Sequence, residues 1–515
     1  MNIKSICQSV RKRGLVRSVY IATIRAIDKV KCKPLLHEIV DNYSRKTICS
    51  DDYLGIINKL KYCCSAALDD PKNPKNKVKL ELLLFDYREA CEKRPFSNLD
   101  NKESEVFKEI MKWYFKTETV LRKGLSAQFN KFQSHMMALY IKNRLPECYL
   151  ENSVAPVQEK LVFMENVNCP SPTNSHLIKV LRKQEKYEIV TIGLKRRKVS
   201  EIEYYENALN LIKESANAKA IFLSTANDLF SWIDLRAETK LIQLWHGVGM
   251  FKKVGWSTVD KHFGRGASAR EEYDQYRNYS YVTIAGKEQA WTFEDAMHIP
   301  ADSGVIVPVG ISRTDVFYDE GYFESIKKKL YTELPQIEGK KIILYAPTFR
   351  GSVRGAKAPD KLDVNLFGEA LSDEYVLFIK HHGLSKDVPP IPEKWKDTFA
   401  FDMGEKKILG IESLLAVADI CISDYSSVAF EYAILERPLI FFAYDMEEYL
   451  DARGMYYDYE EITPGPVCKT TEEMVDYILH IDERFDKQEV IDFKNKYVEA
   501  CDGHATERTI ALIEN

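Results

Sequence analysis

The sequence predicts an α/β fold in which two parallel-sheet domains face a common cleft, preceded by a helical region. Three observations predict this fold. The chain has 515 residues, which is more than one hydrophobic core usually supports. From residue 160 onward, short aliphatic runs alternate with helical segments in two successive series. Before residue 150, no strand-like alternation of any length occurs.

Composition describes a folded protein without a strong charge preference. Hydrophobic residues make up 45% and charged residues 29% of the chain, and the net charge of -4 argues against a nucleic-acid partner. The 11 cysteines include no Cys-x-x-Cys pair, which favours a reducing compartment. We find no secretory signal and no apolar run of the ~18 residues that a membrane span needs. A protein that is soluble or lies on a membrane surface is therefore expected.

The first region, residues 1–150, is expected to be helical. Residues 1–33 contain nine Lys or Arg residues and one acid, Asp28, and their apolar residues recur at helical spacing. This pattern is typical of a basic amphipathic helix at a membrane surface, although a helix docked on the protein itself would look similar. Residues 51–148 indicate several further helices and contain no catalytic constellation.

Two Rossmann-like domains are expected next, at residues 158–325 and 326–515, and the last helix is a candidate to cross back to the first of them. Parallel sheets bind ligands at the carboxyl ends of their strands, in the crevice outside the sheet. The nine predicted strands are 160–164, 187–192, 220–223, 240–244 and 281–285 in the first domain, and 341–345, 375–379, 420–423 and 438–442 in the second.

The first motif at a strand end is Gln243-Leu244-Trp245-His246-Gly247-Val248-Gly249. A histidine held between a strand end and glycines can enter a cleft, and its pKa near neutrality suits a general base. A histidine that only caps the loop by hydrogen bonding is the alternative. The motif is not a dinucleotide fingerprint, because the third glycine is misplaced.

Two further strands end in polar residues. In Tyr345-Ala346-Pro347-Thr348-Phe349-Arg350, Thr348 and Arg350 are expected to face outward as donors, although such an arginine is often only a solvated surface group. The strand 375–379 continues into Lys380-His381-His382-Gly383. Adjacent histidines on an extended chain point to opposite sides, so they do not favour a shared metal ion.

The fourth motif is Ser423-Asp424-Tyr425-Ser426-Ser427, followed by a predicted helix over 428–435. Serines at a helix start present hydroxyls and backbone amides to an anion, and simple N-capping is the alternative. Together the four motifs predict a cleft for a pyrophosphate. The chain contains no Asp-x-Asp, so protein cations are expected to neutralise a leaving nucleotide.

From about residue 160 to its end, the chain resembles the CDP-glycerol glycerophosphotransferases of teichoic-acid and capsule synthesis. The motifs that carry the resemblance lie between 419 and 467: Ser423 to Ser427, Arg437-Pro438-Leu439-Ile440-Phe441-Phe442-Ala443-Tyr444-Asp445, Glu447-Glu448-Tyr449 and Pro464-Gly465-Pro466. Departures from the family pattern are Val248 and Gly249 in place of threonine and proline, Lys380 in place of arginine, Gly383 in place of proline, and Glu431 in place of aspartate.

The resemblance implies a GT-B fold that uses no metal or other cofactor. It implies transfer of glycerol phosphate, or a related polyol phosphate such as ribitol phosphate, from a CDP-activated donor to a hydroxyl of a lipid-linked or polysaccharide acceptor, with release of CMP. It also implies a peripheral protein on the cytoplasmic face of the cell membrane.

The resemblance further implies roles for individual residues. His246 matches the proposed base, and His382 matches the histidine that contacts the donor phosphates. Arg350 is added to the substrate-contacting residues from its own motif. The remaining substrate-contacting positions that carry over are Trp245, Gly247, Val248, Gly249, Arg313, Pro347, Thr348, Lys380, His381, Ser426, Ser427 and Glu431.

Two other functions stay open at this point. A GT-B glycosyltransferase or an epimerase that uses a UDP-sugar would keep the fold and change the reaction. A non-catalytic protein that assembles a membrane complex would use the basic helix and the helical region instead.

Overall fold

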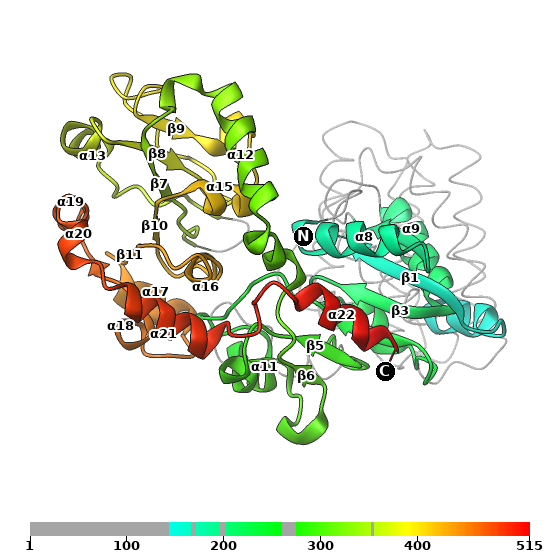
Figure 1. Ribbon diagram of the computed structural model, residues 1–515. Helices are drawn as coiled ribbons and strands as arrows, with labels where there is room; N and C mark the ends of the chain where they lie inside the picture. The colour runs from blue at the N-terminus through cyan, green and yellow to red at the C-terminus, as the bar shows by residue number, and fades with distance from the viewer. Residues whose placement is uncertain (1–143, 166–170, 195–200, 260–273, 352–354, 515) are drawn as a thin grey trace, which may run out of the picture. The chain divides into compact units, whose positions relative to one another are not determined.

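The computed structural model describes residues 144–165, 171–194, 201–259, 274–351 and 355–514 (Figure 1). The predicted basic helix within 1–33 and nearly all of the predicted helices within 51–148 lie outside these residues. The chain divides into two compact units, residues 1–145 and 146–515, and the second unit contains both sheets. None of the described helices is both long enough and apolar enough to cross a membrane.

The first domain is built on a six-stranded parallel sheet with the strand order β2-β1-β3-β4-β5-β6. Leu161 to Met164 in β1 are completely buried, as expected for a parallel strand that helices cover on both faces. The strands are β1 (Gln158–Glu165), β2 (Glu188–Gly193), β3 (Ala218–Leu223), β4 (Lys240–Gln243), β5 (Tyr281–Thr283) and β6 (Ile306–Val307). The α-helices in the described residues of this domain are α8 (Pro172–Gln184), α9 (Glu201–Ser215) and α11 (Ala290–Met297), and the 3-10 segment η6 (Ser312–Tyr318) leads out of it.

The second domain has a six-stranded parallel sheet in the order β12-β11-β10-β7-β8-β9. Counted from β9, this is the 3-2-1-4-5-6 order of doubly wound sheets, in which the order reverses between β7 and β10. The strands are β7 (Lys341–Tyr345), β8 (Tyr375–Ile379), β9 (Ala400–Asp402), β10 (Ile420–Ser423), β11 (Leu439–Phe442) and β12 (Val467–Cys468). The helices are α12 (Glu320–Glu333), α13 (Val364–Leu371), α14 (Met403–Lys406), α15 (Ile411–Val417), α16 (Val428–Ala433), α17 (Met446–Arg453), α18 (Tyr459–Ile462), α19 (Thr471–Leu479), α20 (Ile481–Arg484) and α21 (Lys487–Tyr497).

The predicted α/β class with two parallel sheets is confirmed. All nine predicted strands are present, and their ends agree with the structure to within two residues. The strands β6, β9 and β12 were not predicted, because two or three residues are too few to show a periodic pattern.

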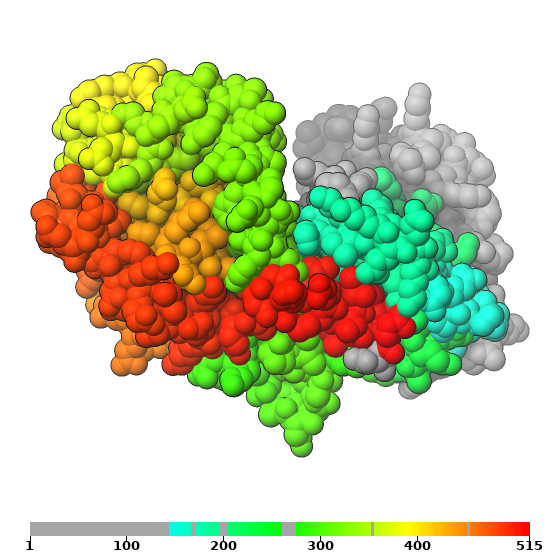
Figure 2. All heavy atoms as spheres, viewed as in Figure 1, coloured from blue at the N-terminus to red at the C-terminus, as the bar shows by residue number. Residues whose placement is uncertain are grey.

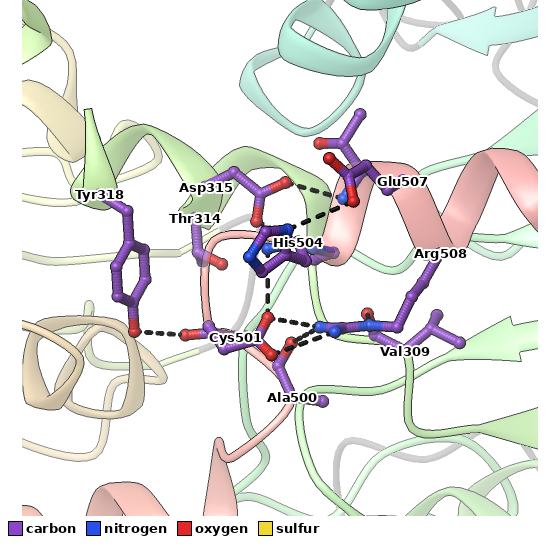
Figure 3. A network of polar contacts seen from close by, with 12 residues as sticks. Val309, Thr314, Asp315, Tyr318, Ala500, Cys501, His504, Glu507 and Arg508 are labelled. Atoms are coloured by element: carbon purple, nitrogen blue, oxygen red, sulfur yellow. Dashed lines mark hydrogen bonds and ion pairs between the residues drawn. The ribbon is translucent and has the colours of Figure 1, made fainter.

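The C-terminal helix α22 (Ala505–Glu514) packs on the first domain rather than the second. Leu512 and Ile513 belong to the hydrophobic core that surrounds β1, and Figures 1 and 2 show this red segment running from the second domain to the first. The start of α22 is held by Asp315 of η6, whose carboxylate accepts hydrogen bonds from the backbone N–H groups of Ala505 at 3.0 Å and Thr506 at 2.7 Å (Figure 3). Helix α22 therefore returns from the second domain to pack on the first.

The loop after β4 also joins the two domains. Phe251 of this loop packs against Phe430 of α16, with ring centroids 4.5 Å apart. A Cβ atom on Gly249 would lie 2.3 Å from the Phe430 ring, so only glycine allows this approach. The backbone N–H of Lys253 donates to the carbonyl of Gly454 at 3.1 Å. Because the same loop carries His246, its position relative to the second domain is fixed by packing.

Candidate functional site

A pocket of about 600 Å³ lies between the two domains. It is lined by the segments that follow β3, β4, β7, β8 and β10, together with residues of α8, η6, α15 and α16. The structure therefore brings together in one pocket His246, Arg313, His382 and Ser426, which are spread over 180 positions of the sequence. The other predicted site residues that line it are Trp245, Gly247, Gly249, Pro347, Thr348, Lys380, His381, Ser427 and Glu431.

The sheet topology explains why the pocket lies here. In a doubly wound sheet, the loops on either side of the point where the strand order reverses diverge and leave a crevice. In the second domain this point lies between β7 and β10, whose following residues Pro347, Thr348, Ser426 and Ser427 line the pocket. The pocket thus occupies the position where such folds bind their ligands.

His246 follows a residue in an unusual backbone conformation. Trp245 has φ of 56°, a left-handed value that is uncommon for a large side chain. The side chain of Gln243 supports this turn, because its Oε1 accepts a hydrogen bond from the backbone N–H of Trp245 at 2.9 Å. Trp245 turns its ring towards the buried Phe293, at a centroid distance of 6.0 Å. The turn leaves the imidazole of His246 exposed in the pocket.

The environment of His246 favours its neutral form. Although the imidazole is accessible from the pocket, protein surrounds it on most sides, and this burial lowers its pKa from the ordinary value. The positive charge of Arg313 lowers the pKa further, whereas a hydrogen bond to the backbone of Ser224 opposes the shift. A neutral imidazole at pH 7 can accept a proton, so the geometry and the pKa both suit a general base.

The two adjacent histidines have different environments. Nδ1 of His382 accepts a hydrogen bond from the backbone N–H of Leu384 at 3.2 Å, which leaves Nε2 as the protonated nitrogen of the neutral ring. His382 can therefore donate a hydrogen bond to an anion in the pocket. His381 is half-buried against Tyr345, and it also lines a second cavity of about 350 Å³ beside α13. Burial lowers the pKa of His381.

The serines before α16 lie at the pocket, but the helix that follows them is short. It comprises Val428 to Ala433, whereas the sequence predicted a helix over 428–435. The Oγ atom of Ser426 accepts a hydrogen bond from the backbone N–H of Val428 at 3.3 Å, so the serine caps this turn and its hydroxyl hydrogen stays available to a ligand. Lys380 also lines the pocket, and its Nζ lies 3.4 Å from the carbonyl oxygen of Met403.

Arg313 connects the two domains within the pocket. Its guanidinium forms a bidentate ion pair with Glu431 of α16, at 3.1 Å from Nε to Oε1 and 3.0 Å from Nη2 to Oε2. Nη1 donates to Oγ1 of Thr173 in α8 at 3.2 Å. A second carboxylate, Glu412 of α15, lies 3.9 Å from Nε. Arg313 and Glu431 are both buried, and their charges are directed first at each other.

Two predicted contact residues do not line the pocket, and these predictions are corrected here. Val248 is 1% exposed and packs in the core that both domains share, because the turn at Trp245 directs it away from the cavity. Arg350, which was expected to face outward, forms ion pairs with Asp424 at 2.8 Å and with Asp445, and lies among the rings of Tyr425, Tyr444 and Tyr449.

Arg350 instead supports a residue that does line the pocket. The carboxylate of Asp424 accepts hydrogen bonds from both the backbone N–H of Thr348, at 2.9 Å, and its hydroxyl, at 3.1 Å. Arg350 donates a hydrogen bond to the same carboxylate of Asp424, and it therefore stabilises the loop after β7 on the side away from the pocket. Thr348 lines the pocket, but both of its donors point to Asp424 and its side chain is buried, so the expectation that Thr348 faces outward as a donor is corrected as well.

Several pocket residues were missed in the sequence. Ser224 and Thr225 follow β3 and form a polar strand end like the four motifs already described, so the same reasoning could have found them. Lys252 lies three residues after Gly249 and adds a further cation to the wall. Thr173 and Glu412 belong to helices and carry no signal in the sequence that separates them from surface residues.

Comparison with known proteins places the chain in a family. Residues 148–515 match the family model of the CDP-glycerol:poly(glycerophosphate) glycerophosphotransferases. The teichoic acid poly(ribitol-phosphate) polymerase of Bacillus spizizenii is 34% identical over 300 residues, which cover 58% of this chain and 47% of that protein. The teichoic acid glycerol-phosphate primase of Bacillus subtilis is 31% identical over 314 residues, which cover 60% of this chain and 78% of that protein. The match thus spans about half the length of the polymerase.

A solved structure supports the fold. The wall teichoic acid polymerase TagF superposes with a TM-score of 0.60 at 21% identity, covering 76% of this chain and 98% of that one. The family match covers both domains and every segment that lines the pocket. The chain belongs to the CDP-glycerol:poly(glycerophosphate) glycerophosphotransferase family.

Proposed function

We propose that this protein transfers a polyol phosphate from a CDP-activated donor to a hydroxyl group of an acceptor and releases CMP. The observation that carries the proposal is the convergence of His246, His382, Lys380 and the Ser426–Ser427 pair on one pocket of about 600 Å³. Family membership supports the same reaction. A TagF structure was obtained with CDPG, and the relatives named above act on ribitol phosphate or glycerol phosphate.

In the proposed reaction, an oxygen of the acceptor hydroxyl attacks the distal phosphorus of the donor. The bond from this phosphorus to the bridging oxygen breaks, and CMP leaves with that oxygen. The imidazole of His246 takes the proton of the attacking hydroxyl, which its lowered pKa permits at neutral pH. In this proposal the Nε2–H group of His382, the ammonium of Lys380 and the hydroxyls of Ser426 and Ser427 stabilise the negative charge on the phosphates, and their position in the pocket lining supports that role.

The proposal also concerns the identity of the polyol and of the acceptor. The relatives include a ribitol-phosphate polymerase and a glycerol-phosphate primase, so the proposal covers both polyols. We propose a lipid-linked or polysaccharide acceptor in the synthesis of a teichoic-acid-like or capsule polymer, and a peripheral position on the cytoplasmic face of the cell membrane. The basic residues of the segment 1–33 support the membrane position.

The experiment that tests the proposal identifies the nucleotide that is released. Purified protein is incubated with CDP-glycerol, CDP-ribitol and UDP-N-acetylglucosamine, each with a set of lipid-linked acceptors. We expect CMP from at least one CDP-polyol, together with an acceptor that gains polyol phosphate. UDP or UMP as the product would favour a UDP-sugar enzyme instead. No turnover with any donor and acceptor would favour a protein that acts only in assembly.

A further inference from the structure

Two carboxylates, Glu412 and Glu431, line a pocket that is proposed to hold a pyrophosphate, which is also negatively charged. Carboxylates close to phosphates repel them unless they are paired or serve another group of the ligand. Glu431 is paired, because Arg313 takes both of its oxygens at 3.0 and 3.1 Å. Glu412, the other carboxylate in the pocket wall, has no comparable partner.

Glu412 lies in the first turn of α15, and its side chain is 16% exposed. Oε1 of Glu412 is 3.9 Å from Nε of Arg313, beyond hydrogen-bond distance, and this guanidinium makes its hydrogen bonds to Glu431 and Thr173. In the described part of the chain, no other side chain donates a hydrogen bond to Glu412. Burial raises the pKa of Glu412 and the negative charge of Glu431 raises it further, whereas the positive charge of Arg313 and a hydrogen bond from the backbone of Glu412 itself oppose the shift.

The carboxylate of Glu412 therefore keeps acceptor positions that no protein side chain uses, and when a ligand displaces water from the pocket a donor of the ligand must fill them to avoid a cost in free energy. The proposed pyrophosphate cannot supply this donor, because its oxygens accept hydrogen bonds and have none to donate to Glu412. The hydroxyl groups of the same ligand do donate, and a CDP-polyol carries them on its ribose and on its polyol. A carboxylate among phosphate-binding groups is therefore suited to the hydroxyl-rich part of the ligand.

We propose that Glu412 is a binding residue that accepts a hydrogen bond from a hydroxyl group of the bound donor. This inference rests on the proposed function and adds a determinant of donor recognition to it. Glu412 is held in place by α15 and by the charge of Arg313, which is shared with Glu431. The ribose and the polyol offer the same chemistry, and binding measurements can separate them.

The experiment measures dissociation constants by calorimetry with the full chain. The ligands are CMP, 2′-deoxy-CMP, 3′-deoxy-CMP, CDP-glycerol and CDP-ribitol. The variants are Glu412→Ala and the isosteric Glu412→Gln, which keeps the fold if alanine at this position does not. Glu338→Gln, an exposed glutamate outside the pocket, is the matched control.

If Glu412 binds the ribose, Glu412→Ala lowers the affinity for CMP about 10-fold, as expected for a hydrogen bond to a charged group. The variant and the wild type then bind one of the two deoxy-CMP ligands equally well, namely the one that lacks the hydroxyl that Glu412 contacts. If Glu412 binds the polyol, the affinity for CMP stays at the wild-type value and the affinity for CDP-glycerol or CDP-ribitol falls by a similar factor. Glu412→Gln shows the same pattern with a smaller loss.

Two results would overturn the inference alone. Both Glu412 variants could bind every ligand as the wild type does, or they could bind more tightly, which would mean that Glu412 only repels the phosphates. A wild-type protein that binds none of the cytidine ligands would contradict the proposed function itself, whatever the variants do.

Discussion

At the scale of single residues, His246 is the group whose environment is most clearly arranged for chemistry. The unusual backbone at Trp245 costs of order 1–3 kcal/mol, and Gln243 stabilises it locally. Gly247 and Gly249 then allow the loop to approach the second domain closely. As a result, the imidazole of His246 faces the pocket in its neutral form, and the backbone of its loop is fixed by packing.

Replacement of His246 by alanine should reduce kcat by about 10² to 10⁴ and change the affinity for the CDP donor much less, because a general base acts in the transition state. Steady-state kinetics and donor binding check this prediction. His504→Ala is the control, since His504 is exposed just before α22, pairs with Glu507 and does not line the pocket. Equal losses in kcat and in donor affinity would assign His246 to binding instead.

The pH dependence gives a separate test of the same residue. A base must be neutral to act, and burial lowers the pKa of His246 below the ordinary histidine value of about 6.5. The acid limb of the profile of kcat/KM should therefore lie below pH 6.5, and it should disappear in His246→Ala. An acid limb above this value would mean that a cationic imidazole is stabilised, contrary to the structure.

Arg350 is predicted to act on stability. Its replacement by methionine leaves the carboxylates of Asp424 and Asp445 without their cation, and Asp424 is only 1% exposed. Loss of one partner from a buried ion pair costs about 3–5 kcal/mol, so the free energy of unfolding in urea should fall by about that amount. Arg484→Met, which breaks an exposed ion pair with Asp476, should cost less than about 1 kcal/mol. Similar losses in the two variants would contradict the assigned role.

At the scale of structural elements, the loop after β4 and the helix α22 hold the domains together. Gly249→Ala should destabilise the contact of this loop with α16, because the new methyl group would lie 2.3 Å from the Phe430 ring. Overpacking of this kind costs typically ~1–3 kcal/mol. Gly383→Ala is the control, because nothing lies within 4 Å of a Cβ atom there. Thermal unfolding of the two variants compares them directly, and equal midpoints would show that the loop is not tightly docked.

The start of α22 offers a second test at this scale. Asp315→Ala removes the acceptor for the N–H groups of Ala505 and Thr506 (Figure 3) and should lower the free energy of unfolding by about 0.5–2 kcal/mol. Asp302→Ala, at an exposed position in the short 3-10 segment between α11 and β6, should change it by no more than about 0.5 kcal/mol. An unchanged stability of Asp315→Ala would mean that α22 does not depend on this cap.

The elements also show what the sequence can and cannot reveal. The buried strands β7, β8 and β10 were located to the residue, because continuous aliphatic runs bounded by polar residues leave little choice of register. The ion pair between Arg313 and Glu431 joins residues 118 positions apart, and no local pattern encodes it. Arg350 and Val248 were misplaced for the same reason, since the direction of a loop side chain depends on tertiary neighbours.

At the scale of the whole molecule, the strand-end motifs predicted that a single pocket would form, and the fold explains why they meet. Parallel sheets gather the residues that follow their strands at one edge, so four motifs that are distant in sequence converge when two such edges face each other. Thr173 and Glu412, which helices contribute to the pocket, were not predicted, because a helical segment shows which face is buried but not which ligand lies in front of it. Glu431 of α16 was predicted only through the family resemblance.

The most direct test of this account is a crystal structure of the full chain with CDP-glycerol or CDP-ribitol bound. We predict that the pyrophosphate lies between the two domains, with phosphate oxygens at hydrogen-bond distance from His382 and from Ser426 or Ser427, and that the distal phosphorus faces His246. A donor bound at another place, or in the pocket with its pyrophosphate away from these residues, would contradict the account.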